Sequence, residues 1–398
     1  MSDPAKIRPQ CRNRIGTAAV KQAILRKYSI TAGTGQGQQR QSSRHAEDTA
    51  IQPDNNRTIK NKEKNHMSIK AAILGAGNMG KGHAKRLLES GAQISCVCDK
   101  SRAAREAFRS EIQQENLQEF EDFDKMLDEG DFQVLFICLP PFAQDHQFER
   151  AAERGKHIFI EKPIALDTET GRRMVESAGK NGIITRVGFH MRQGAAVRKM
   201  KELIVSGKAG RPVLFHGHYS CNSLHTPWWI NVDLCGGQIY EQAIHVYDLC
   251  RYLMGEPKYA AGVMGNVCHN HIHNYTVEDV SASFAGFTNG AVAAITANNC
   301  EIPGEWIGSF KVVFEKVTAD FRDFNHAVFT YTGENEIRTE TVDSREDAYL
   351  DEVKEFLACV KEKRQTTCDI REGFKSLCYV ETVVESAGMD GVKIGLHK

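Results

Sequence analysis

The feature that most constrains the fold is a glycine-rich segment placed directly after a short apolar run. Residues 69–74 read IKAAIL and are followed by GAGNMG, which has G-x-G-x-x-G spacing. The next residues, KGHAKRLLES, have helical character, and a second apolar run at 93–98 ends in Asp99. A strand, a glycine turn, a helix and a second strand ending in an acid are typical of a unit that binds a dinucleotide.

Each glycine of this turn has its own physical role. Gly75 permits the tight turn, Gly77 lets the backbone approach the pyrophosphate at the helix N-terminus, and Gly80 lets the helix pack closely on the strand. Asp99 lies 19 residues after Gly80, where a carboxylate binds the ribose hydroxyls. Because this carboxylate would repel a 2′-phosphate, we expect NAD, while the nearby Lys100 leaves NADP possible.

Strands and helices continue to alternate after this unit. Strand-like runs occupy 134–141, 157–163 and 183–189, and helical patterns occupy 148–156 and 168–182. This alternation predicts an α/β fold with a doubly wound parallel sheet, whose ligand lies beyond the carboxyl ends of the strands. The predicted cofactor contacts are Gly75, Gly77, Asn78, Met79, Gly80, Asp99, Lys100, Leu139, Pro140, Glu161 and Lys162.

The first 66 residues differ in composition from the rest of the chain. They hold 13 Lys and Arg against 5 Asp and Glu, and they are poor in large apolar side chains. Three interpretations stay open: Met67 is the natural start, the segment is a disordered tail, or it is a targeting peptide. Because the whole chain has no net charge, residues 67–398 are mildly acidic, which disfavours a nucleic acid as partner.

Length and composition indicate a two-domain protein that is not in a membrane. The chain has 398 residues, 41% of them hydrophobic, and no apolar run approaches the roughly 18–20 residues that cross a bilayer. Its 12 cysteines match no disulfide or zinc spacing. Reduced thiols in a cytoplasmic enzyme are therefore expected.

The motifs taken together resemble the glucose–fructose oxidoreductase, inositol dehydrogenase and rhizopine-catabolism family (Gfo/Idh/MocA). The resemblance covers residues 67–398 and rests on GAGNMG, the Pro140 turn, EKP at 161–163, VGFHMR at 187–192, GGQIYEQAIHVYD at 236–248 and the sheet-like segment 276–292. It implies a Rossmann domain at 67–188 and a C-terminal α/β domain at 189–398 with a large open, mostly antiparallel sheet. It also implies a homodimer or homotetramer formed through that sheet.

The resemblance implies NAD(P)-linked oxidation or reduction of a sugar, inositol or related polyol, and three residues carry the expected catalysis. Lys162 follows an apolar strand directly and corresponds to the family's lysine that hydrogen-bonds the reacting oxygen. His245 is the expected general base. Glu241 stands where the family usually has Asp, and it shares a helix face with His245, so it could contact substrate or fix the tautomer of the imidazole. We also expect Asp248 to support His245.

Other side chains are candidates for substrate contacts. His190 and Arg192 follow the last Rossmann strand, and Trp228 and Trp229 precede the catalytic helix. Aromatic faces stack on sugar rings, but adjacent indoles are as often core residues. The histidine-rich segment 269–273 lacks acidic or cysteine partners at ligand spacing, so no metal is predicted.

Two alternatives to the dehydrogenase remain open from the sequence. One is a glycoside-cleaving enzyme of the same fold, which oxidises and then re-reduces its sugar with bound NAD. The other is a non-catalytic protein that senses a dinucleotide. Retention of both Lys162 and His245 argues against a sensor, because a sensor does not need a proton relay.

Overall fold

The computed structural model describes residues 68–333 and 336–396, and all structural statements below concern these residues. The three interpretations of residues 1–66 therefore lie outside the described part. Contacts join Ser68–Lys398 into one compact unit. None of the helices in the described ranges is both long and apolar enough to cross a membrane.

The first half of this unit contains a six-stranded sheet in the order β3-β2-β1-β4-β5-β6. All of its strand pairs are parallel, and this order is that of the dinucleotide-binding fold. The strands are β1 (Lys70–Leu74), β2 (Gln93–Cys98), β3 (Gln118–Phe120), β4 (Val134–Ile137), β5 (His157–Ile160) and β6 (Thr185–Val187). The predicted Rossmann sheet is confirmed.

Helices cover both faces of this sheet, as the run of apolar residues in β1 requires. Ala71 and Ile73 face a cluster with α2 and α3, whereas Ala72 and Leu74 face the opposite cluster with α4, α5 and α6. These helices are α2 (Asn78–Glu89), α3 (Arg102–Ile112), α4 (Phe123–Glu129), α5 (Gln147–Glu153) and α6 (Thr168–Asn181). The sequence patterns did not predict β3, α3 or α4.

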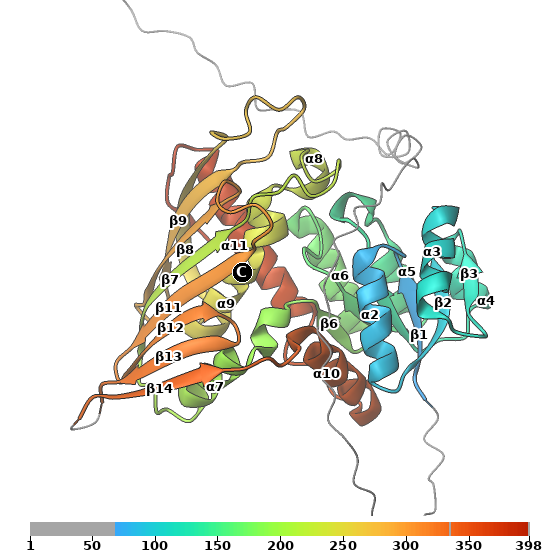
Figure 1. Ribbon diagram of the computed structural model, residues 1–398, viewed down its shortest axis with the longest axis horizontal. Coiled ribbons are helices and arrows are strands. Elements are labelled where there is room, and N and C mark those ends of the chain that lie inside the picture. The colour runs from blue at the N-terminus through green and yellow to red at the C-terminus, as the bar shows by residue number, and fades with distance from the viewer. Residues whose placement is uncertain (1–67, 334–335, 397–398) are drawn as a thin grey trace, which may run out of the picture. The chain divides into compact units, whose positions relative to one another are not determined.

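The second half contains a nine-stranded sheet in the order β14-β13-β12-β11-β7-β10-β9-β8-β15 (Figure 1). Only β10 and β7 pair in parallel, so the expected large, mostly antiparallel sheet is confirmed. The strands are β7 (Pro212–Ser220), β8 (Pro257–Gly265), β9 (Val280–Phe287), β10 (Val292–Asn298), β11 (Ile307–Phe314), β12 (Val317–Asp323), β13 (His326–Tyr331), β14 (Arg338–Asp343) and β15 (Ile394–Gly395).

Helices pack on one face of the open sheet and extend to the Rossmann sheet. Helix α9 packs against β7 and α11 against β8. Helix α10, by contrast, buries Val353 and Phe356 in the Rossmann core, so the predicted division at residue 188 stays a prediction. The helical elements of this half are η2 (His190–Gln193), α7 (Ala195–Val205), α8 (Val232–Cys235), η3 (Ile239–Ala243), α9 (Ile244–Met254), α10 (Ala348–Glu362) and α11 (Ile370–Ala387).

Candidate active site

The glycine turn joins β1 to α2 and leaves a free space at the helix N-terminus. Gly75 has φ +98°, and a Cβ on Gly80 would lie 2.0 Å from the carbonyl oxygen of Gly75. At Gly77, by contrast, a Cβ would meet nothing within 4 Å. Gly77 also caps α2 without a side-chain hydrogen bond, so the first N–H groups of the helix are open to a ligand. This turn fits the pyrophosphate of a dinucleotide.

Asp99 stands at the carboxyl end of β2 beside the same turn. Its carboxylate accepts hydrogen bonds from the backbone N–H groups of Ala76 (2.9 Å) and Ser101 (2.8 Å). Asn78, Met79 and Lys100 are exposed around it. The acid is thus held in place by backbone donors, and its location fits binding of the ribose hydroxyls.

Lys162 follows β5 and reaches across to the second half of the chain. Its Nζ lies 2.9 Å from Oε1 of Glu241 and 2.5 Å from the backbone oxygen of the same residue. Both side chains are 13% exposed. Leu139 and Pro140 follow β4 on the neighbouring strand, so the ion pair lies at the strand edge where the cofactor is expected.

Glu241 is held by further donors from around it. Its Oε2 accepts hydrogen bonds from Nε1 of Trp229 (2.9 Å) and from Gln242, whose amide oxygen accepts from Tyr219 (2.5 Å). Glu241 lies in η3, a π-helical turn, and such turns are frequent at functional sites. The carboxylate is therefore a fixed anion next to a lysine.

The Gly236-Gly237 pair positions this π-helical turn. Both glycines have positive φ (+84° and +103°), and a Cβ on Gly237 would lie 2.3 Å from Glu278. The Glu278 carboxylate accepts a hydrogen bond from the N–H of Ile239 at 2.7 Å, and burial raises its pKa to about 7. The glycine pair thus makes room for the carboxyl group that starts η3.

His245 lies at the start of α9 and is buried. Its Nδ1 has no hydrogen-bond partner among the described residues. Burial lowers the pKa of His245 well below its ordinary value, and the nearby positive charge of Lys162 acts in the same direction. The imidazole is therefore neutral at physiological pH and can accept a proton.

In the structure, Glu241 and Asp248 bond to groups other than His245, so their expected support of the imidazole stays a prediction. The Glu241 oxygens bond to Lys162, Trp229 and Gln242, because these donors are charged or aimed directly at the carboxylate. Asp248 accepts from Arg192 instead. The neighbour of His245 is His190, whose ring centroid lies 4.7 Å away.

His190 is a buried part of the same site. It stacks on Tyr349 of α10 with ring centroids 3.8 Å apart, and burial lowers its pKa to about 3. Its Nδ1, like that of His245, lacks a partner among the described residues. Two neutral imidazoles thus lie side by side, each with a buried nitrogen that lacks a hydrogen-bond partner among the described residues.

Glu161, predicted as a cofactor contact, turns toward the interior. Its Oε1 lies 2.6 Å from Nε2 of His83 on α2, and both groups are buried. Its Oε2 accepts from the backbone N–H of Lys162 at 3.2 Å. A Cβ on Gly188 would lie 2.9 Å from this carboxyl group, so glycine gives it room. Glu161 therefore anchors the strand end that carries Lys162.

Arg192 does not join the site. Its guanidinium forms a two-pronged bond with Asp248 (2.7 Å for each) and a third with Glu372 at 3.1 Å. The side chain is 2% exposed. Because its donors serve a buried network, we leave Arg192 out of the substrate contacts that the sequence suggested.

The two tryptophans have different surroundings. Trp229 is 1% exposed and serves as a donor to Glu241. Trp228 is half-buried, and its ring centroid lies 6.0 Å from that of Phe142, which follows the Pro140 turn. Of the two, only Trp228 offers an aromatic face to a ligand near the cofactor edge.

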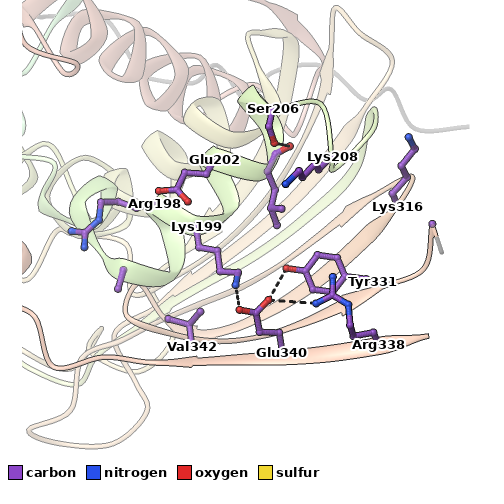
Figure 2. A pocket seen from close by; sticks show the side chains of 13 residues that line it. Arg198, Lys199, Glu202, Ser206, Lys208, Lys316, Tyr331, Arg338, Glu340 and Val342 are labelled. Carbon is purple, nitrogen blue, oxygen red and sulfur yellow. Dashed lines mark hydrogen bonds and ion pairs between the residues drawn. The ribbon is translucent and has the colours of Figure 1, made fainter. Parts of the chain in front are cut away.

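A cavity of about 960 Å³ lies elsewhere, between α7 and strands β13 and β14 (Figure 2). Lys199 and Arg338 point to Glu340 there, and the Tyr331 hydroxyl donates to the same carboxylate at 3.0 Å. None of the predicted site residues lines this cavity. Because the cavity contains none of the residues that the sequence predicts for catalysis, we do not place the chemistry there.

Several supporting residues were not found from the sequence. His83, Gln242 and Tyr349 contact the predicted site residues Glu161, Glu241 and His190, and Tyr219 donates a hydrogen bond to Gln242. Only His83 had a local signal, as a histidine on the helix that follows the glycine turn. Spacing could not reveal the others, because their contacts arise from packing.

Comparison with known proteins identifies the family. Residues 69–189 match the Gfo/Idh/MocA oxidoreductase model with an NAD-binding Rossmann fold, and residues 197–320 match a Gfo/Idh/MocA C-terminal domain. The chain therefore belongs to the Gfo/Idh/MocA family. It is an NAD-dependent oxidoreductase, and the expected cofactor is confirmed as NAD.

Relatives with assigned activities match this chain over half or more of their own length. It is 27% identical over 302 residues to the NAD+-dependent scyllo-inositol 2-dehydrogenase of Bacillus subtilis, covering 74% of this chain and 86% of the relative. It is 29% identical over 201 residues to the inositol 2-dehydrogenase of Salmonella typhimurium, covering 48% and 56%. The fold matches that of levoglucosan dehydrogenase with NADH and levoglucosan (TM-score 0.76, 20% identity, covering 83% of this chain and 100% of the other).

Proposed function

We propose that this protein oxidises a secondary hydroxyl group of an inositol or of a related cyclic polyol or sugar. The observation that carries the proposal is the Lys162–Glu241 ion pair beside the neutral His245, at the strand edge where NAD is expected. NAD supplies the hydride acceptor when it is bound. The chain itself must then position the hydroxyl group and take its proton.

The charge of each residue indicates which of these two tasks it can perform. Lys162 is held in place by its pairing with Glu241, so its ammonium group can donate a hydrogen bond to the substrate oxygen. Neutral His245 can accept the hydroxyl proton, because burial keeps it unprotonated. His190, with a second free ring nitrogen, is suited to bind a neighbouring hydroxyl group.

Two observations support a cyclic polyhydroxylated substrate. The half-buried ring of Trp228 can cover the face of such a ring near Phe142. Relatives with assigned activities include inositol dehydrogenases, and the Pseudarthrobacter phenanthrenivorans relative, 33% identical over 141 residues (34% of this chain, 36% of the relative), is a levoglucosan dehydrogenase. We therefore favour the polyol dehydrogenase over the sensor and the glycoside-cleaving enzyme.

We also propose that the protein pairs through the outer face of its open sheet. Exposed apolar side chains alternate there with buried ones, among them Val263, Phe284, Val292 and Val328. Large apolar side chains that are exposed on one face of a sheet are typical of interaction sites. Light scattering with size-exclusion chromatography should show a dimer or tetramer, and Phe284→Lys should weaken it. The cytoplasmic location expected from the cysteine content stays a prediction.

The test is a panel of inositol isomers, monosaccharides and anhydrosugars with NAD+, measured by absorbance of reduced nicotinamide. We expect net reduction of NAD+ with a cyclic polyol, lost in Lys162→Met. Cleavage of a glycoside without net reduced nicotinamide would instead establish the glycoside-cleaving enzyme. Silence across the panel, together with tight NAD binding, would overturn catalysis and favour the sensor.

A further inference from the structure

Two cysteines that are far apart in the sequence meet at one end of the open sheet. Cys268 follows β8 and Cys300 follows β10, and β9 lies between these strands. Their Sγ atoms and a carboxylate oxygen of Asp279 all lie within 4.8 Å of one another. Cys268 is exposed and Cys300 is partly buried. The histidine-rich segment therefore has acidic and cysteine neighbours that its spacing did not reveal.

Asp279 has a structural task in this cluster. Its buried carboxylate accepts hydrogen bonds from the backbone N–H groups of Val267, Cys268 and His269, each at 2.8 Å. Three donors largely satisfy the carboxylate and fix the loop that carries Cys268. This arrangement favours a reaction between the two thiols over binding of a metal ion, which would need the same oxygens.

The loop that contains Cys268 packs directly against the wall of the candidate active site. Tyr275 and Val277 form a buried cluster with Trp229, and Trp228 and Ile272 pack against that cluster. Trp229 in turn donates its hydrogen bond to the carboxylate that pairs with Lys162. Because these contacts are direct, we expect a restraint on this loop to change the surroundings of the two tryptophans.

Asn299, the neighbour of Cys300, ties the same parts together. Its side-chain amide donates to the Tyr275 hydroxyl (3.2 Å) and to the backbone oxygen of Ser223 (2.9 Å). Its amide oxygen accepts from the N–H of Ser223 at 2.9 Å, and its backbone oxygen lies 2.8 Å from Nε2 of His269. A change in the backbone at Cys300 would therefore affect both the segment that contains Ser223 and the loop that contains His269 and Tyr275.

We propose that Cys268 and Cys300 form a reversible disulfide that regulates the substrate side of the active site; its kinetic consequence rests on the proposed function. The oxidant is a hydroperoxide. With hydrogen peroxide, the exposed Cys268 sulfur attacks one peroxide oxygen, the O–O bond breaks, the other oxygen leaves as water, and Cys268 becomes a sulfenic acid. The Cys300 sulfur then attacks the Cys268 sulfur, the S–O bond breaks and a second water leaves. Two thiols lose two electrons and two protons, and a dithiol reductant reverses the reaction.

The order of the two attacks follows from the surroundings of the thiols. Burial, the hydrogen bond with Cys268 and the charge of Asp279 together raise the pKa of Cys300 to about 12. Cys300 therefore stays protonated and unreactive toward peroxide, whereas Cys268 is open to solvent. Cys268 therefore reacts with the peroxide first, and Cys300 is placed to resolve the sulfenic acid because the two Sγ atoms lie within 4.8 Å of each other.

The first experiment maps the bond in the full chain. Purified protein is treated with a slight excess of hydrogen peroxide, alkylated and analysed by peptide mass mapping, before and after a dithiol reductant. We expect a reducible Cys268–Cys300 link that is lost in Cys268→Ser and Cys300→Ser and kept in Cys378→Ser, whose half-buried thiol on α11 serves as control. Absence of the link, or stoichiometric zinc that Cys268→Ser releases, would overturn the proposal.

The second experiment measures the effect on the active site by tryptophan fluorescence, which needs no substrate, and by the KM for the polyol. The chain's three tryptophans are Trp228, Trp229 and Trp306, and Trp306 lies 6.1 Å from the ring of His225 beside Trp229. Oxidation should therefore change tryptophan fluorescence, and it should change KM for the polyol by about fivefold while the Kd for NAD stays constant. Cys268→Ser should remove both changes.

The outcomes separate the two proposals. A mapped disulfide that leaves both fluorescence and KM unchanged would overturn the regulatory role. A disulfide that changes fluorescence in a protein without polyol activity would sustain the coupling and overturn the proposed function.

Discussion

Two clusters of charged and polar side chains flank α9, and they differ in whether all of their polar groups have hydrogen-bond partners. Lys162 and Glu241 lie before the helix with 13% exposed side chains, next to imidazoles that lack partners. Arg192 and Asp248 lie along the helix with side chains 2% and 1% exposed, and Glu372 and Ser376 complete their bonds. The first cluster keeps capacity for a ligand, and the second only holds elements together. Both clusters contain a cation and a carboxylate, so the type of charge does not distinguish them. They differ in whether neighbouring polar groups lack hydrogen-bond partners.

The largest effect is expected at the first cluster, which contains Lys162 and Glu241. Lys162→Met should lower turnover at least about 100-fold, because a positioned proton-transfer and hydrogen-bonding group is lost. Binding of NAD should persist, since the glycine turn is untouched. Lys201→Met is the matched control, because that lysine is also half-buried but bonds only to the Tyr252 carbonyl. Turnover near that of the unaltered protein would show that Lys162 has no catalytic role.

A substitution in the second cluster, which contains Arg192 and Asp248, should change the stability of the fold. Asp248→Ala removes two bonds from the buried Arg192 and one from Ser376, so it should lower the free energy of unfolding by about 3–5 kcal/mol. Chemical denaturation measures this change. Asp320→Ala, which breaks an exposed pair with Lys311, should cost at most about 1 kcal/mol. Equal losses in the two variants would contradict the distinction between the clusters.

The glycine turn allows the same contrast within one motif. Gly77→Ala should leave the melting temperature nearly unchanged, because the new methyl group meets only free space, yet it should weaken NAD binding at least about 10-fold, which corresponds to 1.4 kcal/mol. Gly80→Ala should instead destabilise the fold, since its Cβ would collide with the Gly75 oxygen. Thermal denaturation and NAD titration distinguish the two. Undiminished NAD affinity in Gly77→Ala would contradict the assigned pyrophosphate contact.

The smallest effect concerns pH. Because burial depresses the pKa of His245, the base is already unprotonated below its ordinary value of 6.5. As pH falls from 8 to 6, kcat/KM for oxidation should therefore stay nearly constant, and the acid limb should appear at lower pH. A pH–rate profile with the best polyol from the panel measures this. A limb at or above 6.5 would mean that the free enzyme protonates His245 in that range.

The parts of this protein that could be predicted are those that the chain specifies locally. The glycine turn, Asp99 and the strand before Lys162 are read within a few residues of one another, and the parallel sheet followed from them. The partner of Lys162 lies 79 positions away, and the bond from Trp229 rather than His245 decides where Glu241 points. The role of Arg192 was likewise decided by Asp248, 56 positions away. Side-chain competition of this kind has no signature in spacing.

The helix α9 has a consequence for how such enzymes diverge. Every one of its residues except Tyr252 is buried, so nearly any replacement there disturbs packing. The segment from Cys221 to Asn231, by contrast, contains exposed and half-buried positions around Trp228. New substrate preferences are therefore expected to arise by drift in that segment, while the helix that carries His245 changes slowly. We expect that exchanging this segment between relatives would change the range of substrates.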